Sequence, residues 1–457
     1  MTSRPGRGAI GAVALCVALG GGAVAVRAQN APAPPRPLSL FDAVSLAVET
    51  HPALRAAEAS FRQANAQLGQ ARSEWFPQLS ARASLMQYQE PMIAYPLHEL
   101  SATAIPIFDE TLMQGGVDLG WLVFDGGGRR ARVGAARAQE EGAAVTREAV
   151  ESQLIADVTR AYLAVLSTAE ILDALGEHDR ALQAERERVR QLLEQGQAAP
   201  VELLRVDAAI AQAAAERIST EAVLDAAERA LARMLAVEVD RVRAGALTRV
   251  RLTARPSADR VTLLDRLERG NLDILEAQYA AQSADWTRRA AQSTWFPRLE
   301  GIGSYGLWAI PGGSTQLEWQ VGLRLSYPLF TGGLRSRSVA GASARAEAAE
   351  ESLALARLRG QEELDRALTS VREQHARGEA MATAVMHLTE VARIERLALD
   401  AGAGTQTDFL RAAADLHRAR ASLVQAEYGE IVALVELSRT TGDLTADWLR
   451  ATMETLP

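Results

Sequence analysis

The sequence predicts a mainly α-helical protein with a smaller β part, in which one structural unit is used twice. Three observations support this fold class. Short motifs recur at offsets of 206 to 220 residues, segments of about ten residues alternate apolar with polar side chains, and two stretches of 67 residues contain no proline. Recurrence indicates a duplicated unit, alternation indicates strands, and long proline-free stretches indicate helices. We expect each unit to run helix, β-hairpin, long α-hairpin.

The first residues have the composition of an export signal. Two arginines without an acid are followed by an apolar run rich in glycine and alanine over 8–26, and then by small residues ahead of a polar one. This order is typical of a secretory signal peptide. We predict a signal peptide over 1–28, cleaved after Ala28, and a linker over 29–38. The alternatives that we favour less are a retained membrane anchor and a lipoprotein anchored through Cys16.

Composition and charge exclude several classes of protein. The chain carries 49 basic residues, all arginine, against 57 acidic ones, a net charge of −8, whereas a nucleic-acid binder needs a basic face. With 48% hydrophobic and 23% charged residues, the chain is too apolar for intrinsic disorder and too charged for a polytopic helical membrane protein. The one cysteine lies in the predicted leader, so we expect neither a disulfide nor a cysteine metal site.

No catalytic motif accompanies this composition. The six histidines lack metalloprotease spacing, and the sequence contains neither a nucleophile elbow nor a P-loop. We interpret the isolated histidines as solvated or seam-filling residues, and the charged run Glu185-Arg186-Glu187-Arg188 as a solvated helix face with local ion pairs. We therefore predict that the protein is not an enzyme and holds no cofactor or metal.

Three motifs define the two copies of the unit. Trp75-Phe76-Pro77 recurs as Trp295-Phe296-Pro297, Phe124-Asp125-Gly126-Gly127 recurs as Phe330-Thr331-Gly332-Gly333, and Leu204-Arg205 recurs as Leu410-Arg411. The first copy carries 14 more residues between its first two motifs. We place the repeats at 39–236 and 259–441, a connector at 237–258 and a C-terminal tail at 442–457.

The first helix of each repeat has a start signal and a stop signal. Ser39 with Asp42, and Thr262 with Asp265, have the spacing of an N-terminal capping box. We expect each helix to begin there. We expect it to end before the proline of the Trp-Phe-Pro motif, because the residue before a proline avoids helical geometry.

Two strands are predicted after each Trp-Phe-Pro motif. Alternation places them at about 79–90, 116–124, 299–309 and 317–328. Ten-residue strands with one apolar face fit a soluble half-buried sheet, which the alternation alone favours, or transmembrane β-strands of 9–11 residues. Three prolines within Leu85–Met113 predict a longer outer loop there than in the second hairpin.

Each Gly-Gly motif is followed by a very long helix and a return helix. The long helices are predicted over 129–195 and 335–401, about 100 Å each at 1.5 Å per residue, with apolar residues at the spacing of a coiled-coil seam. Glycines end them, and the chain returns through 200–236 and 405–441. Each repeat therefore contains a long antiparallel helical hairpin.

Four strands in two hairpins cannot close a barrel within one chain. An open sheet has free edges that pair with other chains, and strands in lipid must form a closed barrel. Closure therefore requires several copies: two would give eight strands and three would give twelve. The long helices are too polar for lipid and must extend into an aqueous compartment.

These motifs, in this order and in two copies behind a signal peptide, make the chain resemble the TolC-type outer-membrane efflux proteins over about 38–442. The resemblance implies a homotrimer in the cell outer membrane, with a twelve-stranded β-barrel continued by an α-helical barrel through the periplasm. It implies a passive exit duct whose partners are outer-membrane lipid, a periplasmic adaptor protein and an inner-membrane pump or secretion transporter. The alternative is a non-conducting periplasmic coiled-coil scaffold, which would have no use for the strands.

The resemblance also assigns roles at the ends of the helical hairpins. The turns expected to contact the adaptor are Gly196, Gln197, Ala198, Ala199, Pro200, Gly402, Ala403, Gly404 and Thr405. A constriction is expected at Asp408, with Glu202 as its first-repeat counterpart and Arg411 as a partly neutralising neighbour. Ordinary turn chemistry and helix capping are the alternative explanations of both groups.

Two further groups belong to the strands. Gly126, Gly127, Gly332 and Gly333 are expected to form flexible joints between strand and helix. The aromatic residues expected to face lipid or its headgroups are Trp121, Tyr305, Trp308, Trp319 and Tyr327. An ordinary sheet core is the alternative for these aromatics.

Overall fold

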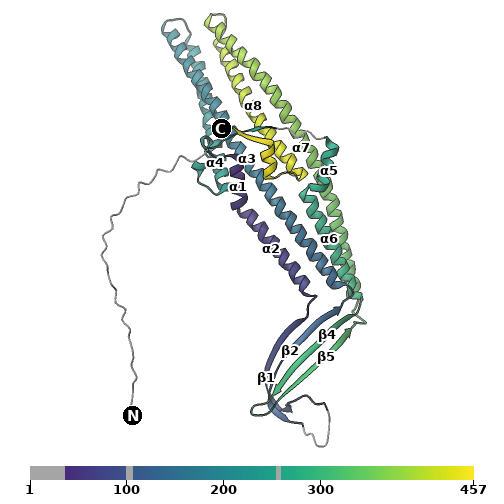
Figure 1. The fold of residues 1–457 in the computed structure, drawn as a ribbon. Coiled ribbons are helices and arrows are strands. Elements are labelled where there is room, and N and C mark those ends of the chain that lie inside the picture. Colours follow the sequence, from purple (N-terminus) through teal and green to yellow (C-terminus); the bar gives the residue numbers. More distant parts are fainter. Residues whose placement is uncertain (1–36, 99–105, 254–258, 457) are drawn as a thin grey trace, which may run out of the picture. The chain divides into compact units, whose positions relative to one another are not determined.

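The computed structural model describes residues 37–98, 106–253 and 259–456, so the predicted signal peptide and most of the predicted linker lie outside the described residues. Two copies of one unit follow each other (Figure 1). The first comprises α1 Leu40–Thr50, α2 Pro52–Ser73, β1 Gln78–Ile93, β2 Phe108–Phe124, α3 Gly128–Glu194 and α4 Pro200–Leu235. The second comprises α5 Arg260–Gly270, α6 Leu272–Gln292, β4 Arg298–Ala309, β5 Thr315–Ser326, α7 Leu334–Asp400 and α8 Gln406–Thr441.

The helical hairpins of the two repeats match in length. Helices α3 and α7 have 67 residues each, and α4 and α8 have 36 each. Among the described helices, none is both long and apolar enough to cross a membrane.

The first helix of each repeat is interrupted, which corrects the prediction of one continuous helix. Helix α1 ends at Thr50, and His51 has extended backbone angles (φ −70°, ψ 130°) before Pro52 opens α2. A proline at the first helical position is favourable, whereas the residue before it is forced out of helical geometry. In the second repeat Asn271 makes the same break, and its side chain caps Ile274 N at 3.0 Å.

One predicted cap is correct and one is wrong. Ser39 caps α1 by accepting a hydrogen bond from Asp42 N at 3.1 Å. Helix α5 begins earlier than predicted, because its cap is Asp259, which accepts from Thr262 N at 3.2 Å. Thr262 is therefore the third residue of the helix rather than its cap, and the aspartate three residues before it supplies the capping oxygen.

The four long strands form one antiparallel sheet in the order β1-β2-β4-β5 (Figure 1). Each hairpin pairs within its repeat, and β2 pairs with β4 across the repeats, with Val117 opposite Tyr305. Strands β1 and β5 are the edges. The expected open sheet is therefore present, and its two edges belong to different repeats.

The first hairpin is longer than predicted, and its outer loop is shorter than Leu85–Met113. Strand β1 continues through Pro91 to Ile93, and β2 begins at Phe108. The pairing shifts register between Gln87 and Met92. A proline is tolerated there because β1 is an edge strand and the irregularity removes the need for a ladder hydrogen bond.

One face of the sheet carries large apolar side chains that are exposed in the described chain. Along β5, Trp319, Val321, Leu323 and Leu325 are each 68–74% exposed. They alternate with polar or small residues, so they share one face. No described element covers these side chains, which is the opposite of a half-buried soluble sheet.

The principal core lies where α1, α3, α4 and α8 meet the connector. Tyr162 is fully buried there, and its hydroxyl lies 2.8 Å from Leu38 O and 2.7 Å from Thr248 O. Burial raises the pKa of Tyr162 to about 12. This tyrosine ties the start of the first repeat and the connector to the middle of α3.

The predicted tail is folded against the predicted connector. Helix α9 Ala446–Thr452 leads into β6 Met453–Leu456, which pairs antiparallel with β3 Arg249–Leu252. The connector also contains two short 3-10 helices, Val239–Arg241 and Ala244–Ala246. These segments supply Val242, Val250 and Leu449 to the principal core.

Candidate functional site: hairpin ends and strand-to-helix joints

Both helical hairpins turn through a glycine with a left-handed backbone. Gly196 has φ +71° and Gly402 has φ +72°, a region that favours glycine because it lacks a Cβ. Gly196 N donates to Leu193 O at 3.0 Å, and Gly402 N donates to Leu399 O at 3.1 Å. A Cβ added at either glycine would meet nothing within 4 Å. Pro200 at the start of α4 completes the first turn.

The residues predicted to contact an adaptor thus form two short turns with open surroundings. Most of them are exposed, while Ala198 and Gly404 are half-buried. Ordinary turn chemistry accounts fully for the geometry of these residues. The same geometry leaves their backbone and small side chains accessible to a partner. The contact itself stays a prediction.

The residues predicted at the constriction lie in the first turns of the return helices. Asp408 is exposed, its N–H donates to Thr405 Oγ1 at 3.2 Å, and Thr405 Oγ1 donates to Asp408 Oδ2 at 2.6 Å. Thr405 therefore caps α8, and the Asp408 carboxylate accepts from the threonine hydroxyl. Glu202 is half-buried and Arg411 is exposed. The cap satisfies one carboxylate oxygen and leaves the charge of Asp408 at the surface.

A buried ion network near the hairpin ends was missed from the sequence. Glu185 of α3 is 0% exposed and accepts hydrogen bonds from Arg188, at 2.7 Å, and from Arg396 of α7. Arg188 also lies 3.5 Å from Asp400. We call these four residues the hairpin network. Hydrogen bonding to Glu185 raises the pKa of Arg188.

The interpretation of 185–188 as a solvated face is therefore wrong for its first residue. Glu185 lies three residues after Leu182 and four before Val189, and all three are buried. This spacing places the carboxylate in the coiled-coil seam. The seam spacing around Glu185 was present in the sequence. Its burial could not be inferred, because only the position of the partner helix shows whether a charged residue lies in a seam or at the surface.

Two histidines stack in the interior of the helical hairpins. The rings of His178 on α3 and His417 on α8 have centroids 5.3 Å apart and planes 13° from parallel. His417 is buried, and its Nε2 lies 3.7 Å from a carboxylate oxygen of Glu216 on α4. Burial, together with the neighbouring His417, lowers the pKa of His178, although Glu216 and Asp179 act in the opposite direction. The prediction of seam-filling histidines fits this pair.

The lowered pKa of His178 predicts a pH-dependent stability. The unfolded chain, with a histidine pKa of about 6.5, takes up this proton before the folded protein does. The contribution of neutral His178 is therefore present above about pH 6.5 and is lost as the pH falls below it. We expect the Tm of His178→Gln to fall less than that of the parent between pH 7.5 and 5. His387→Gln, at an exposed site on α7, should follow the parent; a parent-like slope in His178→Gln would contradict the prediction.

The strand-to-helix joints are built turns rather than loose ones. Gly126 and Gly127 have φ +65° and +88°, and Gly332 and Gly333 have φ +58° and +83°. Asp125 is buried, accepts from Arg129 N at 2.7 Å and lies 3.1 Å from Arg132 Nη2. Ion pairs hold the turn of the first joint, and the flexibility of the joints stays a prediction.

Each joint also contains an arginine stacked on a tryptophan. The Arg129 guanidinium lies 4.4 Å from the Trp75 ring, and that of Arg335 lies 5.5 Å from Trp295 and 4.8 Å from Tyr327. Such cation–π contacts favour a desolvated guanidinium. Both arginines follow their Gly-Gly motif at the same spacing, a repeated signal that sequence reasoning overlooked.

The two repeats offer a matched pair of joint substitutions. An ideal Cβ at Gly126 would lie 2.5 Å from the Cβ of Phe296, whereas one at Gly332 would meet nothing within 4 Å. Both positions share a left-handed strain of about 1–2 kcal/mol for alanine. We expect Gly126→Ala to lower the free energy of unfolding by about 1–3 kcal/mol more than Gly332→Ala, because the clash adds to the strain. Equal shifts of Tm in circular dichroism would contradict this.

The predicted belt aromatics are mostly exposed on the sheet. Trp121, Tyr305, Trp319 and Tyr327 are exposed, while Trp308 is half-buried against the small cluster of Ala94, Tyr95 and Leu112. Tyr305 and Trp319 are directly paired across β4 and β5. Trp121 Nε1 donates to Trp75 O at 3.1 Å. Exposure of the other four rings fits a lipid-facing role, which stays a prediction. Trp308 lies three positions after Tyr305 on β4 and therefore projects from the opposite face of the sheet, so the expectation that it faces lipid is wrong.

Strands with an uncovered apolar face that continue into long polar helical hairpins are the architecture of a channel protein of the bacterial outer membrane. The chain belongs to the outer membrane efflux protein family, whose model matches residues 43–237 and 263–443. The resemblance to TolC-type proteins is confirmed.

Individual relatives agree with this assignment. The chain is 26% identical over 422 residues to Protein CyaE of Bordetella pertussis, covering 89% of this chain and 86% of the relative. It is 23% identical over 422 residues to the outer membrane efflux protein BepC of Brucella suis, covering 90% and 87%. Both alignments span both repeats.

Solved structures share the fold. The outer membrane protein VceC of Vibrio cholerae matches with a TM-score of 0.74 at 19% identity, covering 88% of this chain and 96% of that chain. The CmeC outer membrane channel of Campylobacter jejuni gives 0.75 at 17% identity, covering 88% and 85%, and the MtrE channel of Neisseria gonorrhoeae gives 0.74 at 20%, covering 89% and 90%. The expected fold class is confirmed: the chain is mainly helical with a smaller β part and has the fold of outer-membrane channels, whereas the trimer with its twelve strands stays a prediction. The protein is located in the outer membrane.

Proposed function

We propose that the protein is the outer-membrane exit duct of a tripartite efflux or type I secretion system. Substrates delivered by an inner-membrane pump and a periplasmic adaptor would pass through it without energy input from the duct. The observation that carries the proposal is the four-stranded sheet with two free edges and an uncovered apolar face. It continues directly into hairpins built on 67-residue helices.

The pairing inside the chain supports ring closure between chains. The second strand of the first repeat, β2, pairs with the first strand of the second repeat, β4. By the same rule β5, a second strand, pairs with β1 of another copy, which makes a head-to-tail interface that closes as a ring. Eight strands give a barrel filled by its own side chains, whereas larger barrels leave a lumen. A duct therefore favours three copies and twelve strands over two copies and eight.

The test is the mass and the conductance of the purified protein. In detergent, light scattering should give three chains per particle, and the same preparation should form channels in planar lipid bilayers. A monomer without channel activity would overturn the proposal. A trimer that does not conduct would support the alternative, a periplasmic coiled-coil scaffold.

A ring of Asp408 side chains is the proposed constriction. Threefold symmetry would bring three carboxylates together, and such a ring attracts multivalent cations. We expect Asp408→Ala to weaken block by a trivalent cation at the periplasmic end about tenfold or more, since a loss of 1.4 kcal/mol in binding already gives a factor of ten. The measurement is single-channel conductance with increasing cation concentration.

Two variants serve as controls for Asp408. Thr405→Ala removes the helix cap without removing charge, so block should persist. Glu202→Ala removes the half-buried counterpart of the first repeat and should weaken block less. If Asp408→Ala is blocked as strongly as the parent, Asp408 is a helix cap and the constriction lies elsewhere.

A further inference from the structure

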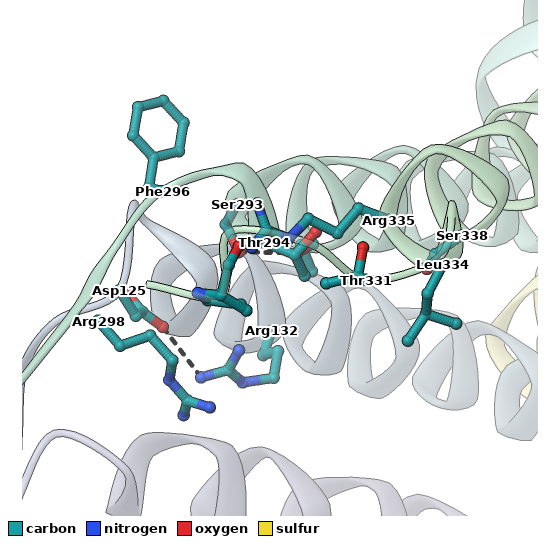
Figure 2. Close-up of a pocket in the computed structure, with 12 residues that line it drawn as sticks. Asp125, Arg132, Ser293, Thr294, Phe296, Arg298, Thr331, Leu334, Arg335 and Ser338 are labelled. Carbon is teal, nitrogen blue, oxygen red and sulfur yellow. Dashed lines mark hydrogen bonds and ion pairs between the residues drawn. The ribbon is translucent and has the colours of Figure 1, made fainter. Parts of the chain in front are cut away.

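A cavity of about 430 Å³ lies at the strand-to-helix joint of the second repeat (Figure 2). Its walls come from the end of α6, the start of β4, the turn before α7 and the first-repeat joint. Three guanidinium groups line it, those of Arg132, Arg298 and Arg335, against one carboxylate, Asp125. Figure 2 shows the guanidinium groups of Arg132 and Arg298 next to each other, with Arg335 apart from them.

Only one of these three cations has a carboxylate partner among the residues that the structure describes. Arg132 lies 2.6 Å from Glu74 and 3.1 Å from Asp125. Arg298 makes no side-chain hydrogen bond or ion pair with any residue that the structure describes. Arg335 is 7% exposed and donates to Pro328 O, but no carboxylate among the described residues pairs with it. Pro328 O and the rings of Trp295 and Tyr327 stabilise the Arg335 guanidinium, but none of them neutralises its charge.

Comparison with the joint of the first repeat shows that the second joint lacks a carboxylate. In the first repeat, Arg129 lies 3.9 Å from the carboxylate of Asp125, which stands just before the Gly-Gly motif. In the second repeat the equivalent of Arg129 is Arg335, and the equivalent of Asp125 is Thr331. The second joint therefore keeps the cation and lacks its anion. An external anion can occupy this place.

The surroundings favour an anion attached to an apolar chain. Leu329 and Phe330, in the turn before α7, are 91% and 90% exposed, and Phe296 on the cavity wall is also exposed. The cavity lies where the strands end and the periplasmic helices begin. If the strands span the outer membrane as in the proposed function, this level is the headgroup region of the inner leaflet.

We propose that this cavity binds the phosphate of an anionic phospholipid of the inner leaflet. Arg298 would donate to the phosphate oxygens, since guanidinium groups match phosphate geometry. The positive charge of Arg335 would add attraction from across the cavity. The acyl chains would lie along Leu329 and Phe330. The site would tie the second joint to the membrane surface, whereas the first joint is held by its own aspartate.

Native mass spectrometry of the full-length protein in detergent tests the site, with phosphatidylglycerol as the probe. We expect Arg298→Gln to retain about tenfold less lipid than the parent, a loss of about 1.4 kcal/mol in binding. Thr331→Asp, which restores the carboxylate of the first repeat, should displace the lipid to a similar extent. Arg324→Gln, on β5 and outside the cavity lining, is the matched control and should retain it.

The competing outcomes are distinct. Displacement of the lipid by millimolar inorganic phosphate would identify a free phosphate ion as the ligand and overturn the lipid assignment. Equal lipid retention in the parent, Arg298→Gln and Thr331→Asp would also overturn the lipid assignment. So would a parent protein that retains no lipid, the result expected if a neighbouring copy supplies the missing carboxylate. Mass and conductance of the same preparations report on the duct separately, so the site can fail while the proposed function stands.

Discussion

Replacing Gly196 and Gly402 together by tryptophan should abolish export while leaving trimer formation and outer-membrane insertion intact. Both glycines lie at exposed turns where an added side chain meets nothing within 4 Å. The indoles would therefore project outward, over the surface that we expect the adaptor to contact. The positive φ angles of +71° and +72° add a strain of about 1–2 kcal/mol per site, which a chain of this size should withstand. Drug tolerance or protein secretion by cells that carry the variant measures the effect.

The control is the double alanine variant, Gly196→Ala with Gly402→Ala. Alanine meets the same backbone strain as tryptophan but adds one methyl group instead of an indole. Export by the alanine variant together with loss in the tryptophan variant assigns the defect to bulk at the docking surface. Normal export by the tryptophan variant would show that these turns do not contact a partner, and loss in both would assign the defect to the backbone.

Replacing Glu185 by alanine should lower the free energy of unfolding by about 2 kcal/mol, because hydrogen bonds to charged groups contribute about 1.5–3 kcal/mol. The carboxylate is fully buried and joins α3 to α7 through Arg396. Its loss leaves Asp400 as the remaining carboxylate that Arg188 and Arg396 share, each at 3.5 Å. We expect a clear drop in Tm, measured by circular dichroism of the helical signal in detergent.

Glu187→Ala is the matched control on the same helix. Glu187 is exposed, and its ion pair with Arg190 is long, at 3.9 Å, so its removal should cost less than about 0.5 kcal/mol. Replacing Glu185 and Arg396 together by leucine should recover part of the loss, because a paired removal leaves fewer unpaired buried charges. Equal Tm values for Glu185→Ala and Glu187→Ala would show that the network contributes nothing to stability.

The parts of the fold that follow from local signals could be predicted from the sequence. The 206-residue offset between the Gly-Gly motifs is reproduced by the starts of α3 at Gly128 and α7 at Leu334. Proline-free length and the seam spacing suffice for such helices, and alternation suffices for β5. Glycine chemistry likewise identified the turns at Gly196 and Gly402.

The parts that depend on distant neighbours could not be predicted. The break at His51 is different, because Pro52 forces the residue before it out of helical geometry; this local signal was present in the sequence and was overlooked. The pairing of β3 with β6 joins residues about 200 positions apart. The burial of Glu185 depends on Arg396, which lies on the other repeat. At the candidate site, the second joint lacks the carboxylate that the first joint has. This difference became clear only when the positions of Asp125 and Thr331 in the two joints could be compared in the structure.

The equal lengths of the helical hairpins restrict how this chain can change length during evolution. Losing seven residues from α3 alone would shorten that helix by about 10 Å and leave the two hairpin ends at different heights. A seven-residue loss keeps the apolar seam in phase, but α4, α7 and α8 must lose the same number. Insertions and deletions should therefore be accepted as sets of four. Relatives that bridge a wider or narrower periplasm should differ from this chain by whole heptads, in both repeats at once.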